Sequence, residues 1–221
     1  MTWRRLYITV EGQAEKAFAD LALAPHFANY ELEVKARVVV TNRRLGKRGG
    51  VLDFETIRGD LARLMRQDPH PDAYFTTMLD LYALPSTFPG WSDSNGKPAL
   101  EKVITLEQAL KADLADRRFD PYIQLHEFEA LLFCDLNHLE TRISDSHRAL
   151  AHLGAEVVGL KPEEINEGAL TAPSKRIIRH LPIYERVKVR VGAQAAAAIG
   201  LPALRMKCPH FNEWLERLEQ L

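Results

Sequence analysis

Four short apolar runs of strand character alternate with amphipathic segments in the first part of this chain. The runs cover residues 6–10, 34–41, 73–79 and 121–125. The segments between them carry apolar side chains at helical spacing and predict helices over residues 14–23, 53–66 and 99–116, with the first helix ending near Pro25. Such alternation is typical of a parallel sheet covered by helices on both faces. We therefore predict an α/β fold with a mostly parallel, four-stranded sheet flanked by helices.

The rest of the chain is predicted to be mainly helical. Helices are expected over residues 127–133, 140–153, 175–180, 184–198 and 209–221. A chain of 221 residues is long enough to bury one hydrophobic core. We predict a single domain over residues 1–221, in which an α/β core over residues 1–135 is packed by a helical C-terminal part over residues 136–221.

The net charge, the cysteine content and the length of the apolar runs limit the cellular location and the binding partners that we expect for this protein. The formal net charge is −1, so any surface that binds nucleic acid has to be local. Two cysteines far apart in sequence, Cys134 and Cys208, are typical of a reducing compartment and argue against a disulfide framework. No apolar run approaches the roughly 18 to 20 residues of a membrane helix, and the N-terminus lacks the apolar core of a signal peptide. We expect a cytoplasmic protein without a membrane partner.

Acidic residues follow three of the predicted strands. Glu11 ends the first strand, Asp80 ends the third, and His126, Glu127 and Glu129 follow the fourth. In open α/β sheets, ligands bind outside the carboxyl ends of the strands. The sequence therefore predicts that acidic side chains from three strands converge at one edge of the sheet.

Binding of a divalent cation would explain why these acids are placed together. Mg²⁺ prefers oxygen ligands, and paired ions can activate water and stabilise the leaving oxygen of a phosphodiester. The first helical turn brings Glu15 back towards Glu11. The alternatives are that Glu15 is favoured at a helix N-terminus and that Asp80 caps a turn. The presence of Asp80 beside the glutamate pair favours the metal site.

The segment after the fourth strand leaves two arrangements open. If a helix starts at once, His126 and Glu129 share a face; if the strand persists, Glu127 and Glu129 share one. A plainer reading is a first helical turn that carries acids for dipole reasons. One of the two glutamates is expected to reach the site, and the choice between them stays open.

Several basic residues are candidates for contacts with phosphate. Lys175 follows Ser174, a predicted helix cap, and could stabilise charge in a transition state, although a lysine in a first turn is more often only solvated. A basic loop over residues 42–50 could follow a phosphate backbone or be solvated. The candidate nucleic-acid contacts are Arg43, Arg44, Lys47, Arg48 and His126.

Five sequence strings carry a resemblance to a known family. They are Val-Glu-Gly-Gln-Ala-Glu (10–15), Met-Leu-Asp-Leu-Tyr-Ala-Leu-Pro (78–85), Pro-Tyr-Ile-Gln-Leu-His-Glu-Phe-Glu-Ala-Leu-Leu-Phe (121–133), Ala-Pro-Ser-Lys-Arg-Ile (172–177) and Cys-Pro-His-Phe (208–211). The chain resembles the Toprim superfamily, the fold of topoisomerases, bacterial primases and the overcoming-lysogenization-defect nucleases. More closely, it is similar to a bacterial Toprim-like family designated only as a domain of unknown function.

The resemblance implies a Rossmann-like Toprim fold with a Mg²⁺ or Mn²⁺ site and phosphodiester chemistry. It implies that Glu11, Glu15 and Asp80 are metal ligands, that Glu127 or Glu129 serves a second metal, and that Lys175 matches the lysine of the related nucleases. Members of this class often resemble partners of SMC-like or ABC-like ATPases in bacterial anti-phage defence. An ATPase partner is therefore also implied.

Two positions depart from the family pattern. Tyr82 stands where the second acid of an Asp-x-Asp pair would lie, and Ala14 replaces a small hydroxyl residue. We predict a metal-dependent nuclease with Glu11, Asp80 and Lys175 as catalytic residues, with DNA favoured over RNA as the substrate and the choice between them left open. The alternative is a catalytically weak or inactive subunit that binds and regulates an ATPase. The number of metal ions and the oligomeric state, including a homo-oligomer, stay open.

Overall fold

The computed structural model describes residues 3–39, 53–166, 168 and 171–221. The candidate contacts Arg43, Arg44, Lys47 and Arg48 lie outside these residues, as does the end of the strand predicted over residues 34–41. Among the described residues, no helix combines the length and the apolar character needed to cross a bilayer.

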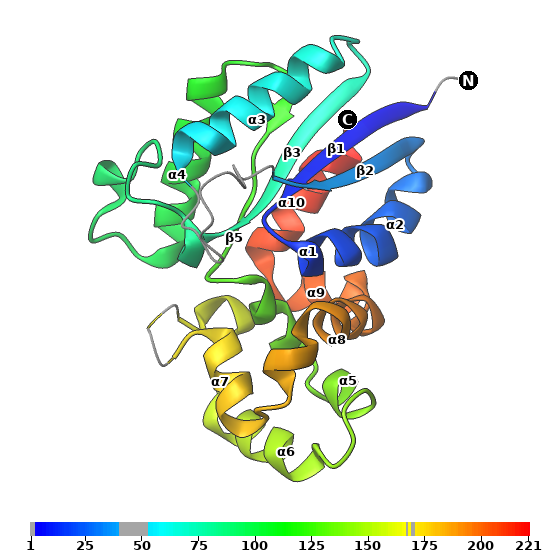
Figure 1. Ribbon diagram of the computed structural model, residues 1–221, viewed down its shortest axis with the longest axis vertical. Coiled ribbons are helices and arrows are strands. Elements are labelled where there is room, and N and C mark those ends of the chain that lie inside the picture. The colour runs from blue at the N-terminus through cyan, green and yellow to red at the C-terminus, as the bar shows by residue number, and fades with distance from the viewer. Residues whose placement is uncertain (1–2, 40–52, 167, 169–170) are drawn as a thin grey trace.

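A parallel sheet forms the centre of the fold (Figure 1). Its strands are β1 (Arg4–Val10), β2 (Leu32–Val38), β3 (Ala73–Asp80), β4 (Phe119–Asp120) and β5 (Ile123–Gln124). The order is β2-β1-β3-β4, β5 also pairs with β3, and every pairing is parallel. This architecture confirms the predicted α/β, Rossmann-like fold.

The fourth predicted strand is interrupted. Two residues separate β4 from β5, and the first of them is Pro121. Proline has no backbone N–H to give to a strand ladder, so the pairing with β3 stops and then resumes. The strand expected over residues 121–125 is therefore limited to β5, and a further short strand, β4, precedes the predicted range.

Helices cover both faces of the sheet (Figure 1). The flanking helices are α1 (Gln13–Phe18), the π-helix η1 (Ala19–Leu23), α2 (Ala24–Ala28), α3 (Phe54–Gln67), α4 (Ala99–Leu114) and α10 (Pro209–Glu219). One hydrophobic cluster packs α3 and α4 against the sheet, and the other packs α1, α2 and α10 on the opposite side. Asp53 caps α3 by accepting a hydrogen bond from the Thr56 backbone N–H at 2.9 Å, which explains why that helix begins where it does.

We predicted that the first helix ends near Pro25, but the helical stretch continues beyond it. The residues that join α1, η1 and α2 all have right-handed helical dihedrals, so the chain stays helical to Ala28. Pro25 lies in the first turn of α2, directly after the π-helical segment. The Ala24 N–H bonds to the Ala19 carbonyl, five residues back, so the wider π-helical turn accommodates a proline that has no N–H to donate.

The C-terminal part is helical, as predicted, but more divided. Beyond the 3₁₀ turns η3 (Leu81–Ala83) and η4 (Ser92–Ser94), it contains η5 (Phe128–Cys134), α5 (Asn137–Glu140), α6 (His147–Glu156), η6 (Pro162–Glu164), α7 (Pro173–His180), α8 (Tyr184–Ile199) and α9 (Leu201–Lys207). The helix predicted over residues 140–153 is broken before α6, where Asp145 has a left-handed φ of 57°. The segment at 127–133 forms the 3₁₀ helix η5.

The helical part shares its core with the sheet. The larger hydrophobic cluster joins Leu6 and Ile8 of β1 to Leu204 of α9 and Leu215 of α10. Trp214 adds a directed contact, because its indole N–H donates to the Thr76 hydroxyl of β3 at 2.9 Å. The C-terminal helices therefore depend on the sheet for the burial of their apolar faces.

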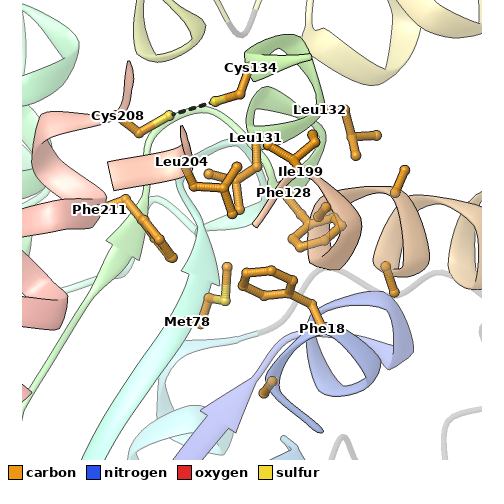
Figure 2. Packing of buried hydrophobic residues seen from close by; sticks show 14 of the residues in the cluster. Phe18, Met78, Phe128, Leu131, Leu132, Cys134, Ile199, Leu204, Cys208 and Phe211 are labelled. Atoms are coloured by element: carbon orange, nitrogen blue, oxygen red, sulfur yellow. Dashed lines mark hydrogen bonds between the residues drawn. The ribbon is translucent and has the colours of Figure 1, made fainter. Parts of the chain in front are cut away.

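The two cysteines meet in this core (Figure 2). Their sulfur atoms are 3.4 Å apart, although Cys134 and Cys208 are far apart in sequence. A disulfide bond measures about 2.05 Å, so both buried thiols are free.

A buried ion pair links α10 to α4. His210 Nε2 lies 3.0 Å from Glu107 Oε1, and that oxygen also accepts the Ile123 backbone N–H at 2.8 Å. Burial disfavours the imidazolium, but the hydrogen bond to Glu107 and the charges of Glu107 and Glu163 outweigh it and raise the pKa of His210. The pair is therefore stabilised by protonation of His210 in the folded state.

We expect this pair to make folding pH-dependent. Because the folded pKa of His210 is above the unfolded value of about 6.5, its contribution is complete below that pH and is lost as the pH rises through the folded pKa. Glu107→Gln should flatten the fall in the free energy of unfolding above pH 6.5, by at most about 1.4 kcal/mol per pH unit. Urea unfolding between pH 6 and 9 measures the difference between the two curves. His147→Gln, at an exposed histidine, serves as the control, and parallel wild-type and Glu107→Gln curves would contradict the prediction.

Candidate functional site

The ends of β1 and β3 bring two acidic residues together. These strands pair in register, with Val10 opposite Met78. Glu11 is the first residue after β1, and Asp80 is the last residue of β3. The Asp80 backbone N–H donates to Glu11 Oε2 at 3.3 Å, so the two residues are in direct contact at the carboxyl edge of the sheet.

Glu15 reaches the same place because the residue before α1 is a glycine. A Cβ on Gly12 would lie 3.0 Å from Glu15 Oε2, a separation tighter than ordinary contact. The absence of a side chain lets the Glu15 carboxylate fold back over the N-terminus of α1. Glu15 is 7% exposed. The Glu-Gly-x-x-Glu spacing thus has a direct steric reason.

Glu127 and Glu129 lie at the same edge of the sheet as Glu11, Glu15 and Asp80. The chain turns at His126, which has a left-handed φ of 64°, and Glu127 is extended before η5 begins at Phe128. Glu127 Oε1 accepts the backbone N–H of Ser174, and Glu129 Oε1 accepts the hydroxyl of Tyr184 at 3.5 Å. Neither arrangement left open by the sequence describes this segment, because β5 ends at Gln124 and only Glu127 is extended before the 3₁₀ helix that carries Glu129.

His126 does not join the glutamates. Its side chain is 3% exposed, and its Nε2 lies 3.0 Å from the carbonyl oxygen of Glu163. It is absent from the residues that line the pocket among those the structure describes. His126 was a candidate contact for nucleic acid, but the structure places it inside the protein.

The acids line one pocket with a volume of about 640 Å³. Two lysines line it as well, Lys175 of α7 and Lys188 of α8, and Tyr82 of η3 forms part of its wall. The acidic residues that it brings together are Glu11, Glu15, Asp80, Glu127 and Glu129. The structure therefore gathers every predicted acidic site residue, together with Lys175, around one space.

Ser174 contributes through its backbone and is not the helix cap that we predicted. The helix α7 begins at Pro173 with Ala172 as its N-cap. Proline is favoured in the first turn because of its fixed φ, and this moves the helix start before Ser174. The Ser174 N–H belongs to the first turn, where it has no intrahelical acceptor, and it bonds to Glu127 instead.

Burial raises the pKa of four of these carboxylates, and repulsion by neighbouring acids adds to the rise at Glu11, Asp80 and Glu129. Burial and the neighbouring Glu15 raise the pKa of Glu11 to about 7, and burial and Glu127 raise the pKa of Glu129 to about 7. Burial raises the pKa of Glu15. Burial and four surrounding carboxylates raise the pKa of Asp80 well above its ordinary range. The positive charge of Lys188 opposes the rise at Glu11, Glu15 and Glu129. The pocket is short of positive charge.

The donor set fits a hard divalent cation. Each of the five acids offers carboxylate oxygens, and Asp80 Oδ1 is shielded from solvent with no hydrogen-bond partner among the described residues. As they are placed, no three His, Cys, Asp or Glu side chains in the described part of the chain are grouped closely enough to hold one ion. Side chains that repel one another would have to move inwards around a cation to bind it.

Sequence reasoning did not single out Lys188 or Tyr184. Both lie on α8, about sixty residues after the last acid, and Lys188 is one of several exposed cations on that helix. Nothing in its local pattern separates it from Arg186 or Arg190. Only the packing of α8 against α1 brings it to the pocket.

These features define an α/β protein with a Rossmann-like sheet and an acidic pocket at the carboxyl edge of its strands. The chain belongs to the family described as "Domain of unknown function (DUF4276)", whose profile matches residues 10–219 and so spans all five acids. No curated protein and no solved structure matches the chain.

Removal of one charge should stabilise the protein in the absence of metal. Burial and the four neighbouring carboxylates raise the pKa of Asp80 well above its ordinary value, so the protonated form contributes stability at low pH and this contribution is lost as the pH rises through the folded pKa. Asp80→Asn removes the carboxyl group that must stay protonated or be ionised at a cost, and it should raise the free energy of unfolding by on the order of 1–3 kcal/mol at pH 8, and by less at pH 5.

Urea unfolding in the presence of EDTA measures this gain. Asp93→Asn, at an exposed acid away from the pocket, is the matched control and should change stability little at either pH. A loss of stability in Asp80→Asn at pH 8 would contradict the repulsion described above.

Proposed function

We propose that this protein is a nuclease that uses Mg²⁺ or Mn²⁺ to hydrolyse phosphodiester bonds in nucleic acid, with DNA as the expected substrate. The observation that carries the proposal is the gathering of five carboxylates and two lysines around one pocket at the carboxyl edge of a parallel sheet. The resemblance to Toprim nucleases supports the same reaction. A cytoplasmic location belongs to this proposal and is supported by the two free thiols.

The charge of the pocket explains why a cation would be needed. Five acidic side chains face two lysines, so a phosphate would meet a site whose ionised form is negative. A divalent ion held there would polarise the phosphodiester as a Lewis acid. In this proposal Glu11, Glu15 and Asp80 hold one ion, and Glu127 or Glu129 is available for a second.

The remaining residues have distinct tasks in this proposal. Lys175 and Lys188 hold the non-bridging oxygens of the phosphate and stabilise the charge that develops on them. The Ser174 N–H and the Tyr184 hydroxyl donate to Glu127 and Glu129, and so orient both carboxylates before they close around an ion. Burial of the glutamates strengthens each of these electrostatic interactions.

A regulatory subunit is the second candidate function. In this alternative the domain does little or no chemistry and binds an SMC-like or ABC-like ATPase, and in both versions the resemblance supports a place in anti-phage defence. The observation that favours it is Tyr82, a half-exposed aromatic residue that lines the pocket where related nucleases carry a second acid. Retention of Glu11, Glu15 and Asp80 favours the nuclease.

The nuclease proposal predicts metal-dependent cleavage that requires Glu11. Purified protein should cleave supercoiled plasmid, linear DNA or RNA when Mn²⁺ or Mg²⁺ is added, and Glu11→Gln should lower the rate at least about 100-fold because a ligand is lost. Asp93→Asn should cleave like the wild type. Equal cleavage by Glu11→Gln would overturn the proposed site. Absence of both cleavage and calorimetric metal binding would favour the regulatory subunit.

A second prediction concerns the lysine that tertiary structure adds to the site. Lys188→Gln should lower the cleavage rate at least roughly 10-fold, because it removes positive charge next to the reacting phosphate. Arg190→Gln on the same helix removes the same charge outside the pocket and should have little effect. Similar losses in the two variants would show that only the overall charge of α8 matters.

A further inference from the structure

Tyr82 is an aromatic residue whose ring is half exposed in the wall of the pocket. It lies in η3, two residues after Asp80, and is 49% exposed. Its backbone N–H donates to the carbonyl oxygen of His126 at 2.8 Å, so the main chain beneath the ring is fixed. Among the described residues, no hydrogen bond or ring contact involves the side chain of Tyr82. A half-exposed ring on a hydrogen-bonded main chain is available to a ligand.

The pocket wall has two chemically different parts. Tyr82, Ala83 and Leu84 form a largely apolar stretch next to the end of β3, whereas the acids and the two lysines supply charge. The apolar stretch and the charged groups border the same space. A ligand that fills this pocket would therefore have a charged group and a flat or apolar group side by side, as a nucleotide has in its phosphate and base.

The size of the pocket favours a nucleotide-sized group. A volume of about 640 Å³ falls within the roughly 300–1,000 Å³ of small-ligand sites. A base can enter such a space and lie against an aromatic ring only if it is unpaired and unstacked, since both faces of a base in a duplex are covered by its neighbours.

We propose that Tyr82 stacks on the base next to the phosphate held in the pocket, so that the protein acts on single-stranded nucleic acid. This inference rests on the proposed nuclease function and deepens it by naming the substrate class. Stacking on an aromatic residue tolerates every base, so the preference concerns strandedness and not sequence. In this view Tyr82 is a substrate-binding residue at a position where related nucleases carry a metal ligand.

The strength of the effect follows from base stacking. Stacking on one aromatic side chain contributes about 1–3 kcal/mol per base, which corresponds to roughly 5- to 150-fold in affinity. Tyr82→Ala should weaken the binding of a single strand by that factor, whereas Tyr82→Phe keeps the ring and should bind like the wild type. Binding to a duplex of the same sequence should be weak in all three proteins.

The experiment compares strands and variants in one buffer. Fluorescence anisotropy with a fluorescein-labelled 12-nucleotide DNA, alone and annealed to its complement, gives affinities in the presence of Mg²⁺, and gel assays give the cleavage rates. Trp3→Ala removes another half-exposed aromatic residue, one that precedes β1 at the far end from Glu11, and is the matched control. The expected result is a loss confined to Tyr82→Ala and to the single strand.

Other outcomes separate the two proposals. Equal binding and cleavage of single strand and duplex, or no loss in Tyr82→Ala, would overturn the role of Tyr82 and leave the nuclease intact. Tyr82→Asp restores the acid of the related nucleases; faster cleavage of both substrates by this variant would mean that Tyr82 only replaces a lost ligand. Absence of binding and cleavage with every nucleic acid would overturn the nuclease proposal and this inference together.

Discussion

The parallel pairing of β1 with β3 is the constraint on which the pocket depends. Strands that run in the same direction end at the same edge, so Glu11 and Asp80 meet although they are distant in sequence. Both strands lie inside the sheet, and their side chains are largely buried on both faces. A shift in their register would separate the two carboxylates and also exchange the side chains that pack in the two hydrophobic clusters, so the fold itself maintains the geometry of the site.

Repulsion among the buried carboxylates distinguishes this edge from the rest of the protein. Two acids elsewhere are matched to cations: Asp68 accepts hydrogen bonds from the Arg5 guanidinium and the Tyr7 hydroxyl, and the buried Asp60 forms an ion pair with Arg37. In the pocket, by contrast, Glu11 and Glu129 hold protons up to about pH 7. Local electrostatic conflict inside an otherwise consistent structure is typical of functional sites. Its natural relief is a cation, which is the physical basis of the nuclease proposal.

The helical C-terminal part completes the site that the sheet begins. The helix α8 packs on α1 and brings Lys188 to the pocket, and α7 presents the Ser174 N–H to Glu127. The shared hydrophobic cluster holds these helices on the sheet, with Phe18, Phe128 and Phe211 at its centre (Figure 2). Packing far from the pocket thus determines which cations face the acids.

Local signals in the sequence determined much of this protein. The acids that follow apolar strands and the return of Glu15 towards Glu11 involve near neighbours, so spacing alone predicted them. Spacing did not reveal that Gly12 makes room for Glu15 or that Asp53 caps α3. Helix ends that depend on backbone conformation were not predicted correctly. The helix continues through Pro25 after a π-helical segment, and the left-handed conformation of Asp145 interrupts a helix that we had predicted to be continuous.

Tertiary structure decided what no local pattern could specify. The sequence determined an α/β chain with acids at the strand ends, because strand and helix periodicities and turn residues act over a few positions. Only the folded chain placed Lys188 in the pocket, turned His126 into the interior and set the Cys134 and Cys208 thiols side by side. These arrangements depend on how whole helices pack, and packing joins residues whose separation along the chain carries no periodic signal.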